Sequence, residues 1–524
     1  TLNVNDREVG PGSVSGVLGF TAQEEKIRGS NFSGNFPDDN IQTLNVAENI
    51  DGFTDEQSWS LMSGIARVNY NLFERYIFTG TFRADGSSRF GSDNRWGNFP
   101  SGAIAWNVHN ESFMEELAAG PIPQLKLRFS YGVTGNNQIG NFAPLGVVGS
   151  SNYVLGGGQA AGRTLNTIPN NKLGWERTEE FNLGVDATLY DHALNLTLEV
   201  YQRNTTDLLI DREIPWSSGF STVTENRGEL RNRGIEFSLT SFNVRQEDFS
   251  WTTNFNISMN RNTVTNLPGG EDIRYEGFTN ASYIHREGLP LASYVGYAID
   301  GVYSPEQIAD SDLAKYPNAR QGNIILRDLN GDGQFTPDVM ERAGGDFAVL
   351  GSAYPDFEFG FQNTVTLGNF ELRANITGSF GGLNHRSEFF RTSRNIDGLF
   401  NVDAGYVENF YRSPENPGDG LTPSPLGPAF GRQQYRDASH SAILAESSNI
   451  WLRSATLRYN FGDNTQLAGF SNASVYLTGT NLLILSPYPG NPDTASMTNR
   501  LAPGLDLGNY PLPRSFTFGV NVAL

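Results

Sequence analysis

The 524-residue chain contains no cysteine, and this absence excludes both a disulfide framework and thiolate metal sites. Positive charge is also scarce. There are 37 Lys and Arg residues against 57 Asp and Glu residues, which gives a formal net charge of −20. A nucleic-acid-binding protein would be expected to carry a basic patch, so this balance argues against that class.

Long apolar runs are missing as well. No segment approaches the roughly 18–20 consecutive apolar residues that a transmembrane helix needs, and no stretch shows a sustained helical apolar stripe. Aromatic residues nevertheless make up 12% of the chain, and glycine is plentiful with 58 residues. Apolar residues are therefore spread singly along strands, which favours one large all-β body.

The C-terminal segment alternates with a period of two residues. Phe516, Phe518, Val520, Val522 and Leu524 fall on one face of the expected strand, and small or polar residues fall on the other. Such a segment resembles the closing strand of an outer-membrane barrel, although Leu524 stands where the usual terminal residue is aromatic.

Similar segments recur along the chain, about 14 in total, and each is near the ~9–11 residues that cross a bilayer on a tilt. They are 13–23, 59–70, 76–85, 101–109, 125–135, 179–190, 194–204, 234–242, 250–260, 357–367, 370–380, 450–460, 473–481 and 514–524.

The connections between these segments alternate between long and short. The long ones fall near 29–57, 85–99, 135–176, 205–230, 261–355, 381–448 and 481–513, and the intermediate join at 109–123 is expected to carry one helical turn. Short periplasmic turns and long extracellular loops produce this rhythm in a membrane barrel, whereas a soluble sandwich has no reason to place every long loop at one end. The residues predict a transmembrane antiparallel β-barrel with about 14 strands in this chain, which is either a whole barrel or the later part of a larger one.

Seven segments, in order, resemble the SusC/RagA family, the TonB-dependent outer-membrane transporters of Bacteroidota. They are residues 83–108, 125–142, 173–186, 225–239, 327–333, 354–365 and 510–522. The resemblance implies a 22-strand barrel in the bacterial outer membrane, within a protein of about twice this length. Residues 1–524 are then expected to be the C-terminal part of the barrel, with the signal peptide, the N-terminal extension and the plug outside this sequence.

The resemblance also implies a function, the import of a bulky nutrient such as a glycan, an oligosaccharide or a peptide. Energy would come from the TonB–ExbB–ExbD complex through the missing N-terminal part, and a SusD-like surface lipoprotein would form a lid. Segments 261–355 and 381–448 are the expected docking surface for that lid. Two alternatives are a non-transporting barrel scaffold in a larger outer-membrane complex, and a surface enzyme or adhesin on a soluble sandwich.

The sequence contains none of the catalytic motifs that would indicate an enzyme. The five histidines are scattered, without an HExxH pair, and no GxSxG follows a strand into a helix. We therefore expect no catalytic residues.

One short motif predicts a structural Ca²⁺ ion. Asp328, Asn330 and Asp332 occupy positions one, three and five of a calcium-type loop, and glycine follows at position six. Gln334 would supply the next ligand through its carbonyl, and Asp338 lies next to position twelve, which a valine occupies. The alternative is an Asx-rich turn in an extracellular loop, without metal. No other cofactor is expected.

Aromatic residues in the long connections are candidates for contact with the solute, because rings stack on sugars and grip peptide side chains. The candidates are Tyr153, Trp216, Tyr283, Phe389, Phe390 and Tyr411. Loop aromatics equally form interfacial girdles or pack loops together. Tryptophans 59, 96, 106 and 251 are assigned to strands or girdles.

Overall fold

A computed structural model describes residues 1–36, 38, 40, 43–276, 282–304, 321–333, 336, 340–386, 401–425, 440–462, 472–494, 503–508 and 510–523. Strands dominate these ranges. Helical structure is limited to short segments such as α1 (Glu115–Ala118), which supplies the expected helical turn, and α4 (Ala404–Asn409). The helices of the described residues all fall short of the length and apolar character that a membrane-spanning helix has.

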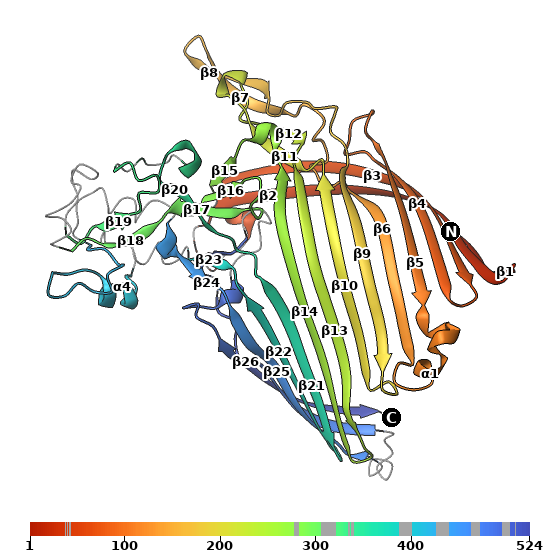
Figure 1. Ribbon diagram of the computed structural model, residues 1–524. Helices are drawn as coiled ribbons and strands as arrows, with labels where there is room; N and C mark the ends of the chain where they lie inside the picture. Colours follow the sequence, from red (N-terminus) through yellow and green to blue (C-terminus); the bar gives the residue numbers. More distant parts are fainter. Residues whose placement is uncertain are drawn as a thin grey trace. The chain divides into compact units, whose positions relative to one another are not determined.

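The main sheet contains fifteen of the described strands, and hydrogen-bonded neighbours follow one another along the chain as in a meander (Figure 1). The strands are β1 (Leu2–Val9), β2 (Gly12–Asn35), β3 (Glu48–Leu72), β4 (Tyr76–Ser87), β5 (Trp96–Asn107), β6 (Gln124–Asn136), β9 (Glu176–Leu189), β10 (Leu194–Thr206), β13 (Glu229–Arg245), β14 (Phe249–Asn266), β21 (Phe357–Leu367), β22 (Phe370–Phe380), β25 (Asn449–Asn460), β26 (Asn472–Leu485) and β28 (Ser515–Ala523). The predicted all-β, antiparallel class is confirmed. All fourteen predicted segments coincide with these strands, and β1 is additional.

The chain divides into two compact units. The first contains residues 1–118, 124–185 and 201–230, and the second contains residues 119–123, 186–200 and 231–524. In the first unit, β1 to β6 pair consecutively in antiparallel fashion. In the second, β14, β21, β22, β25, β26 and β28 do the same.

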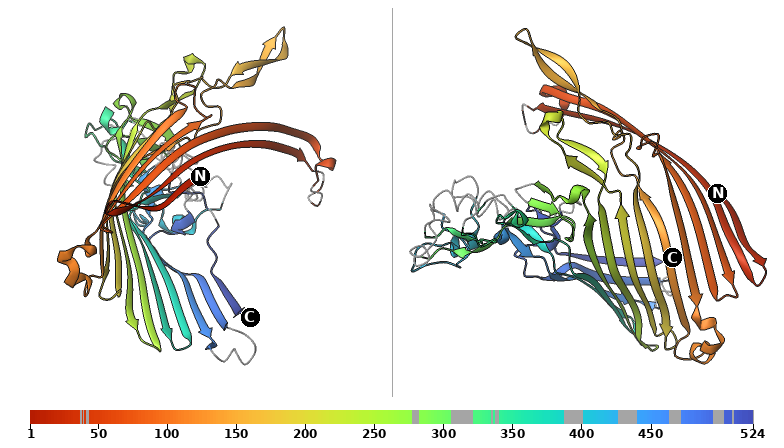
Figure 2. Two further views of the ribbon diagram at one scale, coloured as in Figure 1. Left: turned by 90° about the vertical axis from the view of Figure 1, so that its right-hand side faces the viewer. Right: turned by 45° about the horizontal axis from the view of Figure 1, so that its top comes forward.

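The hairpin β2–β3 of the first unit is much longer than its neighbours. Its register runs from Gly12 opposite Leu72 to Asn35 opposite Glu48, whereas β4 pairs with β3 only as far as Leu61. Residues 24–35 and 48–60 therefore form a two-stranded outer ribbon beyond the end of β4, which Figure 2 shows. The prediction of a loop at 29–57 was wrong for most of this segment. Apolar residues such as Ile27, Phe32 and Phe53 are divided between the two faces of the ribbon among polar ones, so the sequence carries no clear alternating signal there.

Two further predicted loops of the first unit carry hairpins of their own. In 135–176, β7 (Val148–Leu155) pairs with β8 (Gly158–Leu165) through a turn in which Gly156 and Gly157 have positive φ. In 205–230, β11 (Leu209–Glu213) pairs with β12 (Thr222–Asn226).

The long connections of the second unit fold into a packed structure, here called the loop subdomain. It contains a four-stranded sheet of β15 (Ile273–Glu276), β16 (Ser282–His285), β17 (Ser293–Tyr297) and β20 (Phe347–Gly351), a pair of β18 (Ile299–Val302) and β19 (Ile324–Leu326), and a three-stranded sheet of β23 (Leu383–Arg386), β24 (Leu444–Glu446) and β27 (Leu505–Asp506). Two clusters of buried apolar and aromatic residues fill its interior.

One tyrosine joins three of the predicted long connections inside this subdomain. The Tyr294 hydroxyl lies 3.0–3.2 Å from the backbone carbonyl oxygens of Leu383, Pro503 and Gly504. Gly504 has φ +77°, and a Cβ there would lie 2.4 Å from the hydroxyl oxygen. The loops thus hold one another in a defined arrangement through buried contacts.

Candidate functional site

The strand register of the second unit sorts the side chains into two faces of opposite character. One row, read across six neighbouring strands, is Trp251, Val365, Leu372, Leu457, Leu477 and Phe518. The adjacent row points to the other side and is Thr252, Thr364, Arg373, Thr456, Thr478 and Thr517. Because successive residues of a strand face opposite sides, the sheet has an apolar face and a polar face.

The apolar face is uncovered. Leu457 and Leu477 are each 49% exposed, and Phe518 is 70% exposed. A contiguous apolar surface of this extent is unfavourable in water, so it has to be covered by a partner or by lipid.

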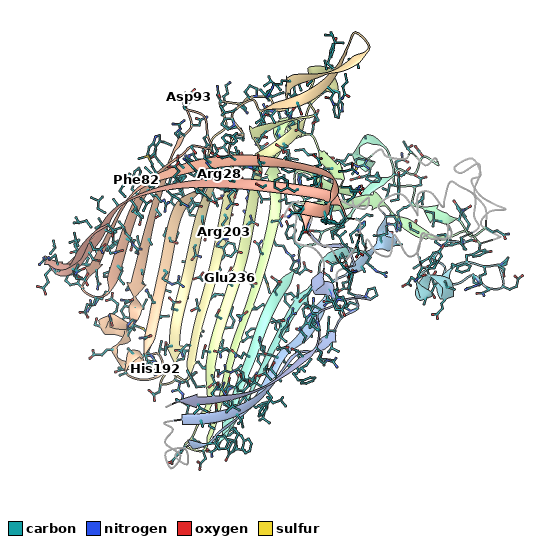
Figure 3. The ribbon with its side chains drawn as sticks, turned by 180° about the vertical axis from the view of Figure 1, so that it is seen from behind. Arg28, Phe82, Asp93, His192, Arg203 and Glu236 are labelled. Atoms are coloured by element: carbon teal, nitrogen blue, oxygen red, sulfur yellow. The ribbon has the colours of Figure 1, made fainter. Side chains whose placement is uncertain are left out.

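The first unit repeats the same division. Val14, Tyr70, Phe78, Ile104 and Phe129 lie opposite one another on its apolar face, and Phe82, labelled in Figure 3, lies on the same face. The next row on the other side is Ser15, Asn69, Thr79, Ala103 and Ser130.

Side chains of the polar face engage one another. The Arg83 Nε atom lies 2.8 Å from the Asp85 carboxylate, and the Thr79 hydroxyl donates to Asn69 over 2.9 Å. In the second unit, Glu371 lies 3.8 Å from Arg458. These charged and polar contacts keep this face hydrophilic, as the lining of a water-filled passage requires.

The loop subdomain contains a buried cation. Arg286 is 3% exposed, and its guanidinium pairs with Asp272 over 2.7 Å and with Glu341. The next residue, Glu287, accepts a hydrogen bond from Leu267 N–H through its carboxylate over 2.8 Å. Arg286 and Glu287, which directly follow β16, thus contact both the segment at 267–272 and the segment around Glu341.

Two histidines are buried in the loop subdomain. Burial lowers the pKa of His285 to about 4 and that of His385 to about 3. Both are therefore neutral near pH 7, where desolvation of a charged ring would be costly.

We expect acidification to loosen the loop subdomain. The ordinary histidine pKa is 6.5, so below that pH the unfolded chain binds protons that the folded subdomain excludes. Stability is complete above pH 6.5 and is lost as the pH falls toward about 4, with a loss of about 2 kcal/mol per histidine near pH 5. Hydrogen exchange, corrected for its intrinsic pH dependence, should show faster opening of β16 and β23 near pH 5 than near pH 7.5. Equal opening at both pH values would contradict the prediction, and β22 serves as the internal control.

The Asp328 segment forms a hydrogen-bonded turn. The Asp328 carboxylate accepts from Gly331 N–H over 2.7 Å and from Gly333 N–H over 3.0 Å, and the Asn330 side-chain oxygen accepts from Asp332 N–H over 2.9 Å. These contacts are those of an Asx-rich turn, the alternative to a calcium loop. Asp346, which is buried, accepts from Leu329 N–H and from Thr336 N–H over 2.8 Å each.

The calcium site itself stays a prediction. Gln334 and Asp338 lie outside the described residues. Within the described part of the chain, no three His, Asp or Glu side chains are grouped so that they could hold a metal ion.

The predicted solute-contacting aromatics fall into three groups. Trp216, between β11 and β12, is 82% exposed, and Tyr153, in β7, is 65% exposed. Tyr283 and Tyr411 are buried, which matches the alternative that loop aromatics pack loops together. Phe389 and Phe390 lie outside the described residues.

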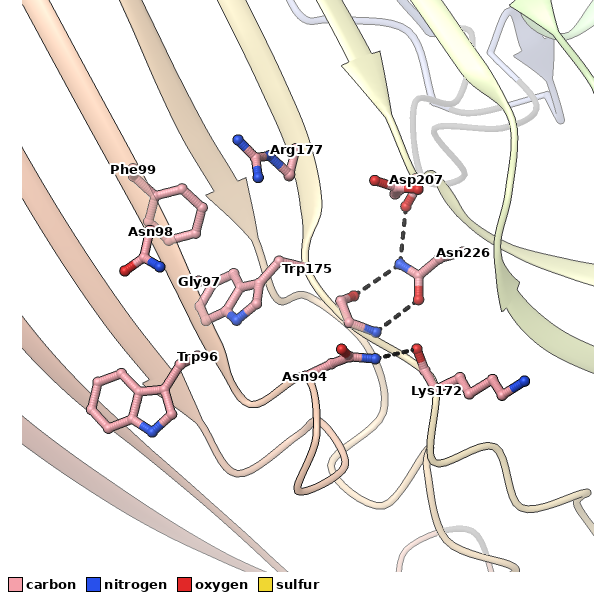
Figure 4. A pocket seen from close by; sticks show the side chains of 11 residues that line it. Asn94, Trp96, Gly97, Asn98, Phe99, Lys172, Trp175, Arg177, Asp207 and Asn226 are labelled. Carbon is pink, nitrogen blue, oxygen red and sulfur yellow. Dashed lines mark hydrogen bonds between the residues drawn. The ribbon is translucent and has the colours of Figure 1, made fainter.

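A pocket of the first unit was not predicted from the sequence. It is a cavity of about 340 Å³ beside the first residues of β5, here called the rim pocket. Figure 4 shows the residues that line it. It is lined by Asn94, Trp96, Gly97, Asn98, Phe99, Lys172, Gly174, Trp175, Arg177, Asp207 and Asn226.

Aromatic rings and amides fix the wall of the rim pocket. The rings of Phe99 and Trp175 pack edge to face, with centroids 5.2 Å apart. A Cβ at Gly97 or Gly135 would lie 2.4 or 2.1 Å from the Phe99 ring, so both positions require glycine. The Asn226 side chain donates to Gly174 O over 2.9 Å and accepts from Gly174 N–H over 2.7 Å.

The sequence held only a weak signal for this pocket. Its residues come from four separate segments, and the asparagines act through single contacts with the backbone, such as that from Asn94 to Lys172 O over 2.7 Å. No sequence motif with a fixed spacing links residues from four separate segments, so the pocket could not be predicted from a pattern. The cluster of Asn, Gly and Trp at 94–98 was the one local indication.

The sequence of the chain is similar to a known protein family and to two characterised relatives. Residues 4–302, more than half of the chain, match the family model described as TonB dependent receptor-like, beta-barrel. The TonB-dependent receptor P3 of Formosa agariphila is 33% identical over 476 residues, which cover 88% of this chain and 45% of that protein. The TonB-dependent receptor SusC of Bacteroides thetaiotaomicron is 29% identical over 487 residues, which cover 88% of this chain and 44% of that protein.

Among solved structures, the fold is similar to that in "Structure of the RagAB peptide transporter". The TM-score is 0.79 at 22% identity, and the match covers 99% of this chain and 54% of that chain. The chain thus spans about half the length of the relatives it matches.

Proposed function

Because the chain belongs to the TonB-dependent receptor-like β-barrel family of the bacterial outer membrane, we propose that it takes part in the import of a bulky solute, a glycan or a peptide. The chain supplies part of the barrel wall and the loops outside it. Energy for import comes from the TonB–ExbB–ExbD complex, through a part of the protein beyond this sequence.

The separation of the two sheet faces carries the proposal. On the apolar face, exposed residues such as Leu457 and Leu477 meet the lipid. On the polar face, an unbroken row of five threonines and Arg373 crosses six strands. Hydroxyl groups both donate and accept hydrogen bonds, so this row suits a hydrated solute of variable structure.

The loop subdomain is the proposed docking surface for a SusD-like surface lipoprotein. Its buried core and the Tyr294 contacts support this role, because a prefolded surface binds a partner without the entropic cost of ordering loops. Trp216 and Tyr153 are the proposed solute contacts, since both rings are exposed in the outer hairpins of the first unit.

Uptake measurements test the import function. Cells that lack the full-length gene, cells that carry it, and cells that carry it without TonB are supplied with mixed oligosaccharides and peptides. Mass spectrometry then identifies what accumulates in the periplasm. We expect accumulation of one class of solute to require both the gene and TonB.

Two results would refute the proposal. Accumulation that is unchanged without the gene would favour the scaffold alternative. Accumulation that requires the gene but not TonB would indicate a passive pore.

A further inference from the structure

The connection between β5 and β6 carries an amphipathic turn. The turn contains η3 (Ser112–Met114), which is followed directly by α1. Phe113 is 66% exposed and Leu117 is 42% exposed, and side chains four residues apart lie on the same side of a helical turn. Glu115, midway between them, lies on the opposite side. The turn therefore presents one apolar side and one charged side to its surroundings.

The apolar side of the turn continues the apolar face of the sheet. Tyr76 and Trp106 lie opposite each other on that face, in the row next to Phe78 and Ile104. Their rings stack with centroids 6.3 Å apart, and the Trp106 ring meets the Phe113 ring edge to face at 6.5 Å. Tyrosine and tryptophan rings at the end of an apolar band mark a membrane interface. Phe113 therefore extends the lipid-facing surface into the connection.

The position of α1 agrees with this continuity. Figure 1 shows α1 beside the ends of β5 and β6, and in the left view of Figure 2 the orange segment projects sideways from the sheet. Short connections of this kind lie on the periplasmic side of outer-membrane barrels. The turn is therefore placed where the inner leaflet of that membrane meets water.

A carboxylate that is largely buried fixes the turn to the interfacial rings. The Glu111 side chain is 11% exposed and lies 3.3 Å from the Arg75 guanidinium. It accepts hydrogen bonds from the Tyr76 hydroxyl over 2.6 Å and from the Trp106 indole N–H over 3.0 Å. Because Glu111 precedes Phe113 by two residues, the group that holds both rings also sets the position of Phe113.

The neighbouring short connection holds the turn from a second side. The side chains of Asn107 and Asn110 both donate to the backbone oxygen of Glu74, over 2.9 and 2.8 Å. The turn is thus ordered by contacts within the protein. Its insertion into lipid requires little further loss of conformational entropy.

We propose that residues 111–118 form an anchor in the periplasmic leaflet of the outer membrane. Phe113 and Leu117 lie among the acyl chains of the phospholipids, Glu115 faces water, and Glu111 is the positioning residue. Lipid is the occupant because the turn is continuous with the lipid-facing surface through Trp106, and an amphipathic turn at an interface buries its apolar side in the membrane. The anchor fixes the height of the wall in the membrane. It rests on the membrane location of the barrel and not on the proposed import.

Spin labels in the full-length protein, reconstituted in phospholipid vesicles, test the anchor. Residues 1–524 contain no cysteine, and any cysteine in the rest of the protein is first replaced by serine. Labels are attached to Phe113→Cys, to Leu117→Cys and, as the control, to Glu115→Cys. Electron paramagnetic resonance then measures how often each label collides with oxygen and with a polar nickel complex. We expect the oxygen-to-nickel ratio at Phe113→Cys and Leu117→Cys to exceed that at Glu115→Cys by at least about threefold, because acyl chains exclude the polar complex.

Glu111→Ala tests the positioning role. It should lower the ratio of the label at Phe113→Cys toward that at Glu115→Cys, whereas Glu116→Ala, an exposed change in the same turn, should leave the ratio unchanged. A label at Ile104→Cys should keep a high ratio in the Glu111→Ala protein, which would show that the wall itself is intact.

Three results would overturn the proposal. Equal ratios at all three labelled positions would place the turn in water. Labels at Phe113→Cys and Leu117→Cys that are shielded from both reagents would show that a protein surface covers the turn. An unchanged ratio in the Glu111→Ala protein would refute the positioning role of Glu111. None of these measurements depends on solute uptake, so failure of the anchor and failure of the import proposal are read separately.

Discussion

Replacement of Arg286 by methionine is expected to destabilise the loop subdomain by about 2–3 kcal/mol. Arg286 is 3% exposed and neutralises Asp272 and Glu341 at once. Methionine has a similar volume but no charge, so it would leave two carboxylates close together without their cation. Hydrogen exchange followed by mass spectrometry should show faster opening of β15, β16 and β17, while exchange in β22 and β25 of the wall stays unchanged.

Arg342→Met is the matched control. Arg342 also lies near Asp272, at 4.0 Å, but its side chain is 60% exposed. Water screens that pair, so its loss should cost less than about 1 kcal/mol. Adding Asp272→Asn to Arg286→Met should recover part of the stability, because one uncompensated carboxylate is removed. Equal effects of the two arginine substitutions would show that the buried ion pairs do not hold the subdomain together.

Leu477→Arg is expected to destabilise the barrel by about 2 kcal/mol or more. Leu477 is 49% exposed within the apolar row of β22, β25, β26 and β28. A cation there would have to enter the hydrocarbon region or distort the lipid around it. Urea unfolding of the full-length protein in lipid vesicles measures the change.

Thr517→Arg provides the comparison for this substitution. Thr517 lies on β28, the strand that pairs with β26. It directly precedes Phe518, the residue opposite Leu477, so its side chain points to the polar face. An arginine there would be solvated, so we expect a change within about 0.5 kcal/mol. If both variants lost equal stability, the assignment of the two faces would be wrong.

The strands could be predicted because, in a sheet with one apolar and one polar face, apolar and polar residues alternate with a period of two along each strand. Leu457 and Leu477 alternate with threonines for this reason. The strand β1 was missed, since its three apolar residues, Leu2, Val4 and Val9, do not keep one alternating pattern across the register shift between Val4 and Arg7. The outer ribbon was missed because its apolar residues, such as Ile27 and Phe32, do not share one face, and pairing through the backbone needs no apolar face.

The long connections resisted prediction because their structure depends on contacts between distant segments. Nothing around Tyr294 indicates that its hydroxyl meets carbonyls more than 200 residues further along the chain. Tyr283 and Tyr153 both lie in predicted long connections and could not be told apart in the sequence, yet Tyr283 is buried and Tyr153 is 65% exposed. The residue types of a binding site were recognisable, but their burial was decided by the packing of the loops.

The outer ribbon has a consequence for the cell that carries this protein. Its two strands continue for about twelve residues beyond the end of β4, or about 40 Å at the usual rise of a strand. If the long connections lie outside the cell, as we propose, this hairpin is open to antibodies and phages in the medium. The ribbon is therefore a suitable place for an epitope tag that reports the protein on living cells.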